Sequence, residues 1–207
     1  YIIAIAFPLI GIITSLDSDF PIGWDTFFHY EISKLIQENH FVMPEIIPNF
    51  FDGVFAGYPP LLHYTAAFLS SLININLLTV YSVLPWIFLF ALLLALYSFF
   101  KEFDKEYALL AVIIFNLIPI YLHEFYVGEF ARIPGLLFAL LCLTNTKKYL
   151  RNPSKNLLIL SGVCYGLTVL SHLYAAAITT VILVYWLIEH YVTRKDYSAV
   201  YIILLGL

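Results

Sequence analysis

The chain has 207 residues, of which 62% are hydrophobic and only 12% are charged. A soluble domain usually has about 45 to 50% apolar and roughly 25% charged residues. A water-soluble globule is therefore excluded, because too few charges remain to solvate its surface. The net charge of -4 gives no basic footprint for nucleic acid. The composition predicts an all-α protein that forms a polytopic transmembrane helical bundle.

Residues 77–100 form the clearest predicted span, because they carry no charge over more than the roughly 20 residues that cross a bilayer core. About seven spans are expected in all. The others are residues 1–16, 107–122, 130–145, 157–170 and 174–188, with a further span opening at 197–207. Because the chain begins and ends inside apolar runs, we interpret residues 1–207 as a single transmembrane module, truncated at both ends.

Residues 17–76 are predicted to form a long external loop that carries interfacial amphipathic helices. Within it, residues 59–73 are apolar but open on two prolines. As a helix this segment reaches only about 22 Å, so it fits a helix that lies at the membrane interface without crossing. His63 in this segment is interpreted as a packing residue.

The basic residues allow two topologies, which differ in whether residues 59–73 cross. Without a crossing, eight of the ten bases share one side, which the positive-inside rule makes cytoplasmic. These are Lys101, Lys105, Lys147, Lys148, Arg151, Lys155, Arg194 and Lys195. The loops 17–76 and 123–132 are then external. With a crossing, the count is equally good and the long loop is internal. We favour the first topology because the long loop holds seven acids and one base, although acids weigh little in that rule.

Residues 24–39 predict an amphipathic helix that lies along a surface. Its apolar stripe includes Phe28 and Ile32, and Asp25 and His29, spaced i and i+4, fall on the same stripe. Ionisable groups on an apolar face are costly, which favours a functional role. Asp25 also stands where an N-cap belongs, so capping of the first-turn amides is an equally good interpretation.

The loop 123–132 places Glu124, Glu129 and Arg132 at a membrane boundary, where charges are expensive and often functional. Glu129 and Arg132 could instead form a simple i, i+3 ion pair. His172 lies at the external end of two predicted spans in the favoured topology. A histidine there could serve a site or make only local hydrogen bonds.

Short motifs give the chain a resemblance to a known enzyme class. Asp25-Thr26-Phe27-Phe28-His29 resembles the first-loop motif of the oligosaccharyltransferase catalytic subunit, above all its archaeal form. Asp52-Gly53 and Gly57-Tyr58-Pro59-Pro60 resemble the Tyr-Pro stretch of the wider GT-C class of membrane glycosyltransferases. The order of spans and loops over residues 77–132 is also similar to that class.

This resemblance implies a membrane glycosyltransferase. It would move a sugar from a polyprenyl-phosphate-type lipid-linked donor to an acceptor on the external face of the plasma membrane, with membrane lipid as its surroundings. It implies Asp25 and Glu129 as catalytic acids and Arg132 and His172 as donor-phosphate contacts. It also implies a divalent cation, Mg or Mn, at Asp25 and His29.

The chain departs from the oligosaccharyltransferase pattern in the second loop. The positions of that enzyme's paired acids fall on Ala131 and Ile133. Two-acid metal binding and transfer to an asparagine amide are therefore not supported by these residues. The departure leaves two alternatives open, a transporter or flippase of lipid-linked saccharides and a non-catalytic membrane module with the same fold.

Overall fold

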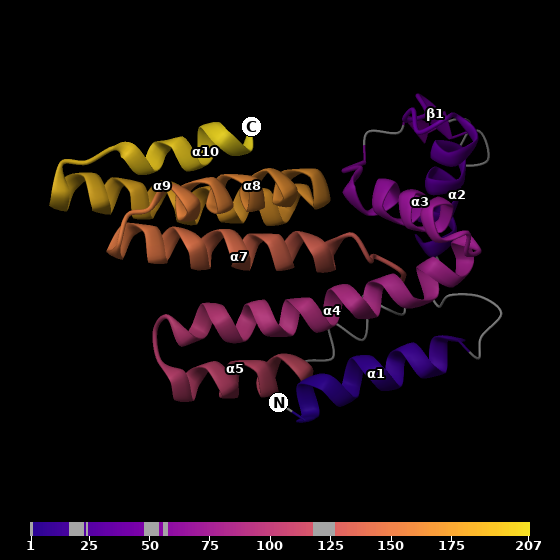
Figure 1. The fold of residues 1–207 in the computed structure, drawn as a ribbon, viewed down its shortest axis with the longest axis horizontal. Helices are drawn as coiled ribbons and strands as arrows, with labels where there is room; N and C mark the ends of the chain where they lie inside the picture. The colour runs from indigo at the N-terminus through magenta and orange to yellow at the C-terminus, as the bar shows by residue number, and fades with distance from the viewer. Residues whose placement is uncertain (1, 17–22, 24, 48–53, 56–57, 118–126) are drawn as a thin grey trace. The chain divides into compact units, whose positions relative to one another are not determined.

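A computed structural model describes residues 2–16, 23, 25–47, 54–55, 58–117 and 127–207. Over these residues the chain is helical, apart from one short antiparallel pairing of two strands (Figure 1). The chain divides into two compact units. Unit 1 contains Tyr1–Phe90 and Asn116–Ala131, and unit 2 contains Ala91–Phe115 and Arg132–Leu207.

Unit 1 contains the elements that precede the predicted span 77–100, together with the first part of that span. Its elements are α1 (Ile2–Leu16), α2 (Asp25–Glu38), β1 (Ile46–Ile47), β2 (Val54–Phe55), α3 (Leu61–Ile73) and the first part of α4 (Leu77–Lys101). The apolar stripe of α2 buries Ile32 and Ile36 against Ile47 and against Ala67 of α3. These contacts make α2 and α3 a packed pair.

Unit 2 contains the remaining helices. They are the end of α4, α5 (Lys105–Leu117), α7 (Arg132–Arg151), α8 (Lys155–Ser171), α9 (Leu173–Arg194), the 3-10 turn η1 (Ser198–Val200) and α10 (Tyr201–Gly206). Its core joins α7, α8, α9 and α10 through Cys142, Tyr165, Leu183 and Ile202. Cys142 and Cys164 are both free thiols.

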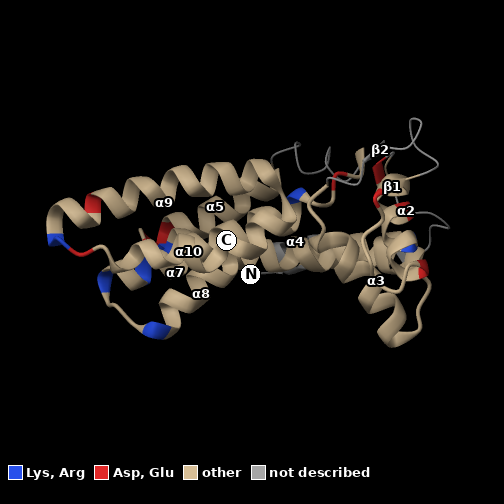
Figure 2. Ribbon diagram, turned by 90° about the horizontal axis from the view of Figure 1, so that it is seen from above, with Lys and Arg blue, Asp and Glu red and all other residues tan. Residues whose placement is uncertain are grey.

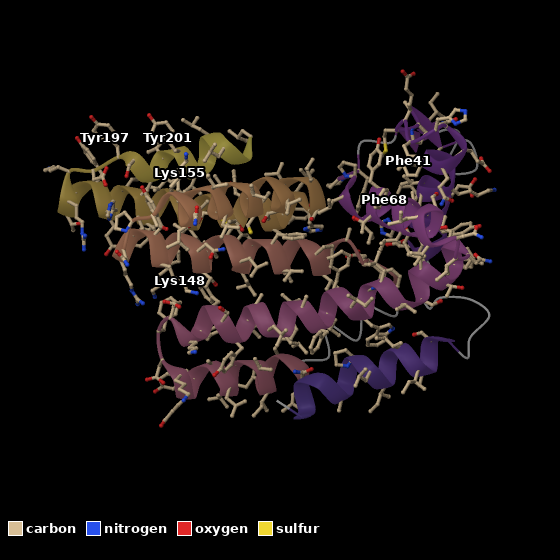
Figure 3. All side chains as sticks on the ribbon, viewed as in Figure 1. Phe41, Phe68, Lys148, Lys155, Tyr197 and Tyr201 are labelled. Atoms are coloured by element: carbon tan, nitrogen blue, oxygen red, sulfur yellow. The ribbon has the colours of Figure 1, made fainter. Side chains whose placement is uncertain are left out.

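The helical fold and the surface helix in the first loop agree with the sequence. The predicted helix 24–39 is observed as α2, and the predicted non-crossing segment is α3, which has 13 residues and spans about 20 Å. Its outer face exposes Phe68 and Leu72, and Figure 3 shows Phe68 directed away from the ribbon. An apolar outer face on a short helix fits a position at an interface.

The lengths of the described helices support fewer spans than the sequence predicts. Among them, α4 and α9 are long and apolar enough to cross a membrane, while α3 and α8 are apolar but shorter. The total of about seven spans therefore stays a prediction. The helix α7 continues past the predicted span 130–145 to Arg151. Basic side chains in the last turn of a helix are favoured by its dipole, which suits Lys148 and Arg151 at this end.

The predicted grouping of basic residues is observed at one end of unit 2 (Figure 2). The helices α4, α7 and α9 end there, and α5 and α8 begin there. Figure 3 labels Lys148 and Lys155 at this end. Glu102, just after α4, binds Arg151 at 2.9 Å and lies 3.7 Å from Lys148. We call this part of unit 2 the basic end.

Candidate functional site

Two glycines bring the start of α2 against the segment that precedes α7. Gly23 has φ +111° and Gly128 has φ +90°, a backbone conformation that favours glycine. A Cβ on Gly23 would lie 2.5 Å from the Gly128 nitrogen, and a Cβ on Gly128 would lie 2.7 Å from the Thr26 nitrogen. Only residues without side chains allow the two segments this approach. It places Asp25 and Glu129, the two predicted catalytic acids, in one region of unit 1.

The negative charge of Glu129 acts on Asp25. Burial raises the pKa of the Asp25 carboxyl above its usual value, and the negative charge of Glu129 raises it further. Asp25 is also the first residue of α2, where the helix dipole favours a carboxylate. A carboxylate with a raised pKa is a stronger proton acceptor than an ordinary aspartate. The pair therefore has the chemistry of a general base beside a second acid.

One turn beyond Asp25, a buried histidine pair ties α2 to α3. Nδ1 of His29 lies 2.9 Å from Nε2 of His63, and the two residues are 2% and 0% exposed. Burial lowers the pKa of His29 to about 4. The pKa of His63 lies well below its usual value because of burial and, second, the neighbouring His29. Both rings are therefore neutral at pH 7, and they share one hydrogen.

His63 is thus both a packing residue, as predicted, and the hydrogen-bond partner of His29. Its second ring nitrogen, Nδ1, is buried and has no hydrogen-bond partner among the described residues. The carbonyl of Pro59 favours the protonated form of the ring, but its effect is smaller than that of burial. A buried, neutral pair that is held by a shared ring hydrogen is a structural tie between α2 and α3.

Two hydroxyl groups continue this tie to α4. The Tyr81 hydroxyl, 1% exposed, donates to the His29 carbonyl at 2.8 Å. The Ser33 hydroxyl donates to the His63 carbonyl at 3.1 Å and lies 2.6 Å from the Tyr81 oxygen. Because each hydroxyl has one hydrogen, the Ser33 hydrogen is shared between the His63 carbonyl and Tyr81. Apart from Nδ1 of His63, these buried polar groups of α2, α3 and α4 thereby bond to one another.

Tyr58 joins the two motifs on which the family resemblance rests. Its ring meets His29 and His63 edge-on, with centroids 5.2 and 5.7 Å away, and Phe28 at 6.1 Å. Edge-to-face contacts of this kind are favourable for aromatic rings. The first-loop motif and the Tyr-Pro stretch, about thirty residues apart in the chain, are therefore packed together.

The predicted phosphate contacts, Arg132 and His172, belong to unit 2. Arg132 begins α7, and His172 is the N-cap of α9, where its Nδ1 accepts from the Ala175 amide at 3.4 Å. A Cβ on Gly135 would lie 2.6 Å from the His172 Cβ. His172 thus packs against the first turn of α7 and makes a local hydrogen bond, which is one of the two alternatives that the sequence left open. Its contact with a phosphate stays a prediction.

Sequence reasoning did not identify Ser33 and Tyr81. A signal for Ser33 was present, because residues 25, 29 and 33 follow each other at i, i+4 and i+8 along one stripe of α2. Tyr81 gave no such signal inside an apolar span. Glu124 lies outside the described residues. Among the residues that the structure describes, no group of three His, Cys, Asp or Glu side chains could hold a metal ion.

Comparison with known proteins identifies one family. The family model described as dolichyl-phosphate-mannose-protein mannosyltransferase matches residues 32–202. No curated protein and no solved structure gives a significant match. The matched range includes Glu129, Arg132 and His172 and begins after Asp25 and His29.

The Tyr81 hydroxyl is predicted to stabilise unit 1. Tyr81→Phe leaves the buried His29 carbonyl without its donor, so the free energy of unfolding should fall by about 1 to 3 kcal/mol. Thermal unfolding of the purified protein in detergent measures this change. Tyr185→Phe is the matched control, because that side chain is 64% exposed. Equal melting of the two variants would contradict the proposed tie.

The histidine pair also predicts how stability depends on pH. Between about pH 6.5 and pH 4 the unfolded histidines bind protons while the buried ones do not. Stability therefore falls as the pH is lowered through this range, by up to about 1.4 kcal/mol per pH unit for each histidine. Unfolding measured at several pH values should give a flatter dependence for His63→Leu than for the wild type. An unchanged slope would show that the pair is not buried in its neutral form.

Proposed function

This chain belongs to the family of dolichyl-phosphate-mannose-protein mannosyltransferases, and we propose that it transfers mannose from a lipid-linked phosphate donor to an acceptor hydroxyl. The family is one of integral-membrane glycosyltransferases of the GT-C class, the class that the sequence motifs indicated. The matching family is the mannosyltransferase family, whereas the first-loop motif had suggested the oligosaccharyltransferase branch. The observation that carries the proposal is the placement of Asp25 beside Glu129 in a chain of this family.

The proposed reaction is a direct displacement at the anomeric carbon. Asp25 takes the proton from the acceptor hydroxyl as the oxygen forms its bond to that carbon. The bond between the anomeric carbon and the phosphate oxygen breaks, and the electron pair leaves with the lipid phosphate. Burial and, second, the negative charge of Glu129 keep the Asp25 pKa high, which strengthens Asp25 as a base and leaves the transferred proton on it until solvent removes it.

The leaving phosphate gains negative charge and needs a positive partner. We assign this role to Arg132 and His172, which stand at the starts of α7 and α9. Helix N-termini add positive potential at such positions. The proposal also places the acceptor and both loops on the external face, as the positions of the basic residues favour.

A divalent cation at Asp25 and His29 is a separate prediction. The described residues supply these two candidate ligands but no third one in reach, and Nδ1 of His29 is already bonded to His63. No step of the proposed reaction is therefore assigned to a metal. Mannose transfer in chelator, with and without added Mg²⁺ or Mn²⁺, tests the cation independently of Asp25.

Replacement of Asp25 tests the proposed base. Asp25→Asn keeps the shape of the side chain but cannot accept the proton, so transfer of labelled mannose should fall about 100-fold or more. The assay uses the full-length protein in proteoliposomes with dolichyl-phosphate mannose as donor. Glu38→Gln is the matched control, since Glu38 lies on the exposed side of the same helix with Lys34.

Two results would count against this function. Full transfer by Asp25→Asn would remove Asp25 as the base. Movement of the lipid-linked sugar across the vesicle membrane without a new glycosidic bond would identify a flippase, an alternative that the family match does not favour.

A further inference from the structure

A pocket of about 410 Å³ lies at the basic end of unit 2, between the last turns of α7 and α9 and the turn that follows α4. This volume falls in the range of small-ligand sites. Three cations line the pocket, Lys147, Arg151 and Arg194, together with the aromatic rings of Phe103 and Trp186. The proposed transfer reaction uses none of these residues.

The pocket is short of negative charge. Glu102 is already occupied, because its carboxylate binds Arg151 at 2.9 Å, its carbonyl accepts a second Arg151 bond at 2.7 Å, and Lys148 lies 3.7 Å away. Glu189 is the only carboxylate in the described lining. Within the described residues, neither Lys147 nor Arg194 forms an ion pair. Two cations without an ion pair, Lys147 and Arg194, thus share the pocket with one carboxylate, which favours an anionic ligand.

The surroundings of Lys147 indicate what an anionic ligand would add to the pocket. Its ammonium nitrogen lies 2.7 Å from the centroid of the Phe103 ring, a cation–π contact in place of a carboxylate. Burial lowers the pKa of Lys147, and the positive charge of Arg151 lowers it further. The Glu102 carboxylate opposes these two effects only in part. An anion in the pocket would oppose them further, because it would pair with Lys147 and offset the repulsion from Arg151.

The position of the pocket distinguishes among anions. The pocket reaches the end of α9, which is one of the two described helices that are long and apolar enough to cross a membrane. Tyr185, Ile188 and Val192 of α9 are 64%, 59% and 61% exposed. They do not line the pocket, but they form an apolar face in the same turns of the helix, beside the face that lines it. A ligand with a charged head and hydrocarbon chains can use both surfaces, whereas a free anion can use only the pocket.

We propose that this pocket binds the phosphate headgroup of an anionic membrane phospholipid, whose acyl chains lie along the exposed apolar face of α9. Lys147 and Arg194 contact the phosphate, while Arg151 remains held by Glu102 and forms the wall behind it. Clusters of basic residues beside a membrane helix attract anionic lipids. This site is separate from Asp25 and Glu129, so it does not depend on the proposed mannose transfer.

The test measures binding of a fluorescent phosphatidic acid to the full-length protein in phosphatidylcholine nanodiscs. The double variant Lys147→Gln/Arg194→Gln should bind at least about tenfold more weakly than the wild type. The matched control is Lys105→Gln/Lys155→Gln, which removes the same charge from the same end of unit 2 but from outside the pocket. Its binding should stay within about twofold of the wild type.

In a second experiment, inorganic phosphate is tested as a ligand at the same concentrations as the lipid, and then as a competitor of the lipid. It should displace the lipid only weakly, because it makes no contact with α9. Equal weakening in the two double variants, or none in either, would overturn the proposal. So would inorganic phosphate that binds as tightly as the lipid, since the site would then belong to a soluble anion. If the pocket double variant does not fold, Arg194→Gln alone should weaken binding about fivefold, and unchanged binding would again overturn the proposal.

Discussion

The arrangement of unit 1 depends on one constraint, which is that the polar groups buried between α2, α3 and α4 must bond to one another. His29, His63, Ser33 and Tyr81 meet this constraint with contacts of 2.6 to 3.1 Å. A buried polar group without a partner is costly, so any rotation of α2 about its axis would lose several bonds together. The start of α2, and Asp25 with it, is therefore fixed by a network that takes no part in the chemistry.

A second constraint brings the other acid to Asp25. The backbone crossing at Gly23 and Gly128 is possible only because neither residue has a side chain. Glu129 follows directly and is therefore held near Asp25, whose pKa it raises. The position of the proposed base thus depends on the buried network, and its raised pKa depends on burial first and on Glu129 second. In unit 2, the basic end gathers Lys148 and Arg151 around the Glu102 carboxylate.

The features of the fold that depend on residues close together in the chain could be predicted from the sequence. The stripe of α2, the shortness of α3 and the grouping of basic residues follow from the spacing of residues along one helix or from their sign. The His29–His63 bond could not be predicted, because its partners are 34 residues apart and an apolar helix gives no sign of what its histidine contacts. The helix α7 is longer than the predicted span 130–145, because Lys148 and Arg151 continue the helix beyond its apolar part. The number of spans depends on contacts with lipid, which the helix lengths alone do not fix.

The central claim is that Asp25 is the base and that Glu129 adds to the effect of burial on its pKa. The most direct test is the pH dependence of kcat/KM for mannose transfer in the wild type and in Glu129→Gln, each normalised to its own maximum. Loss of the negative charge should lower the Asp25 pKa, so the acid limb of the profile should move to lower pH. An acid limb that stays in place or moves to higher pH would contradict this assignment.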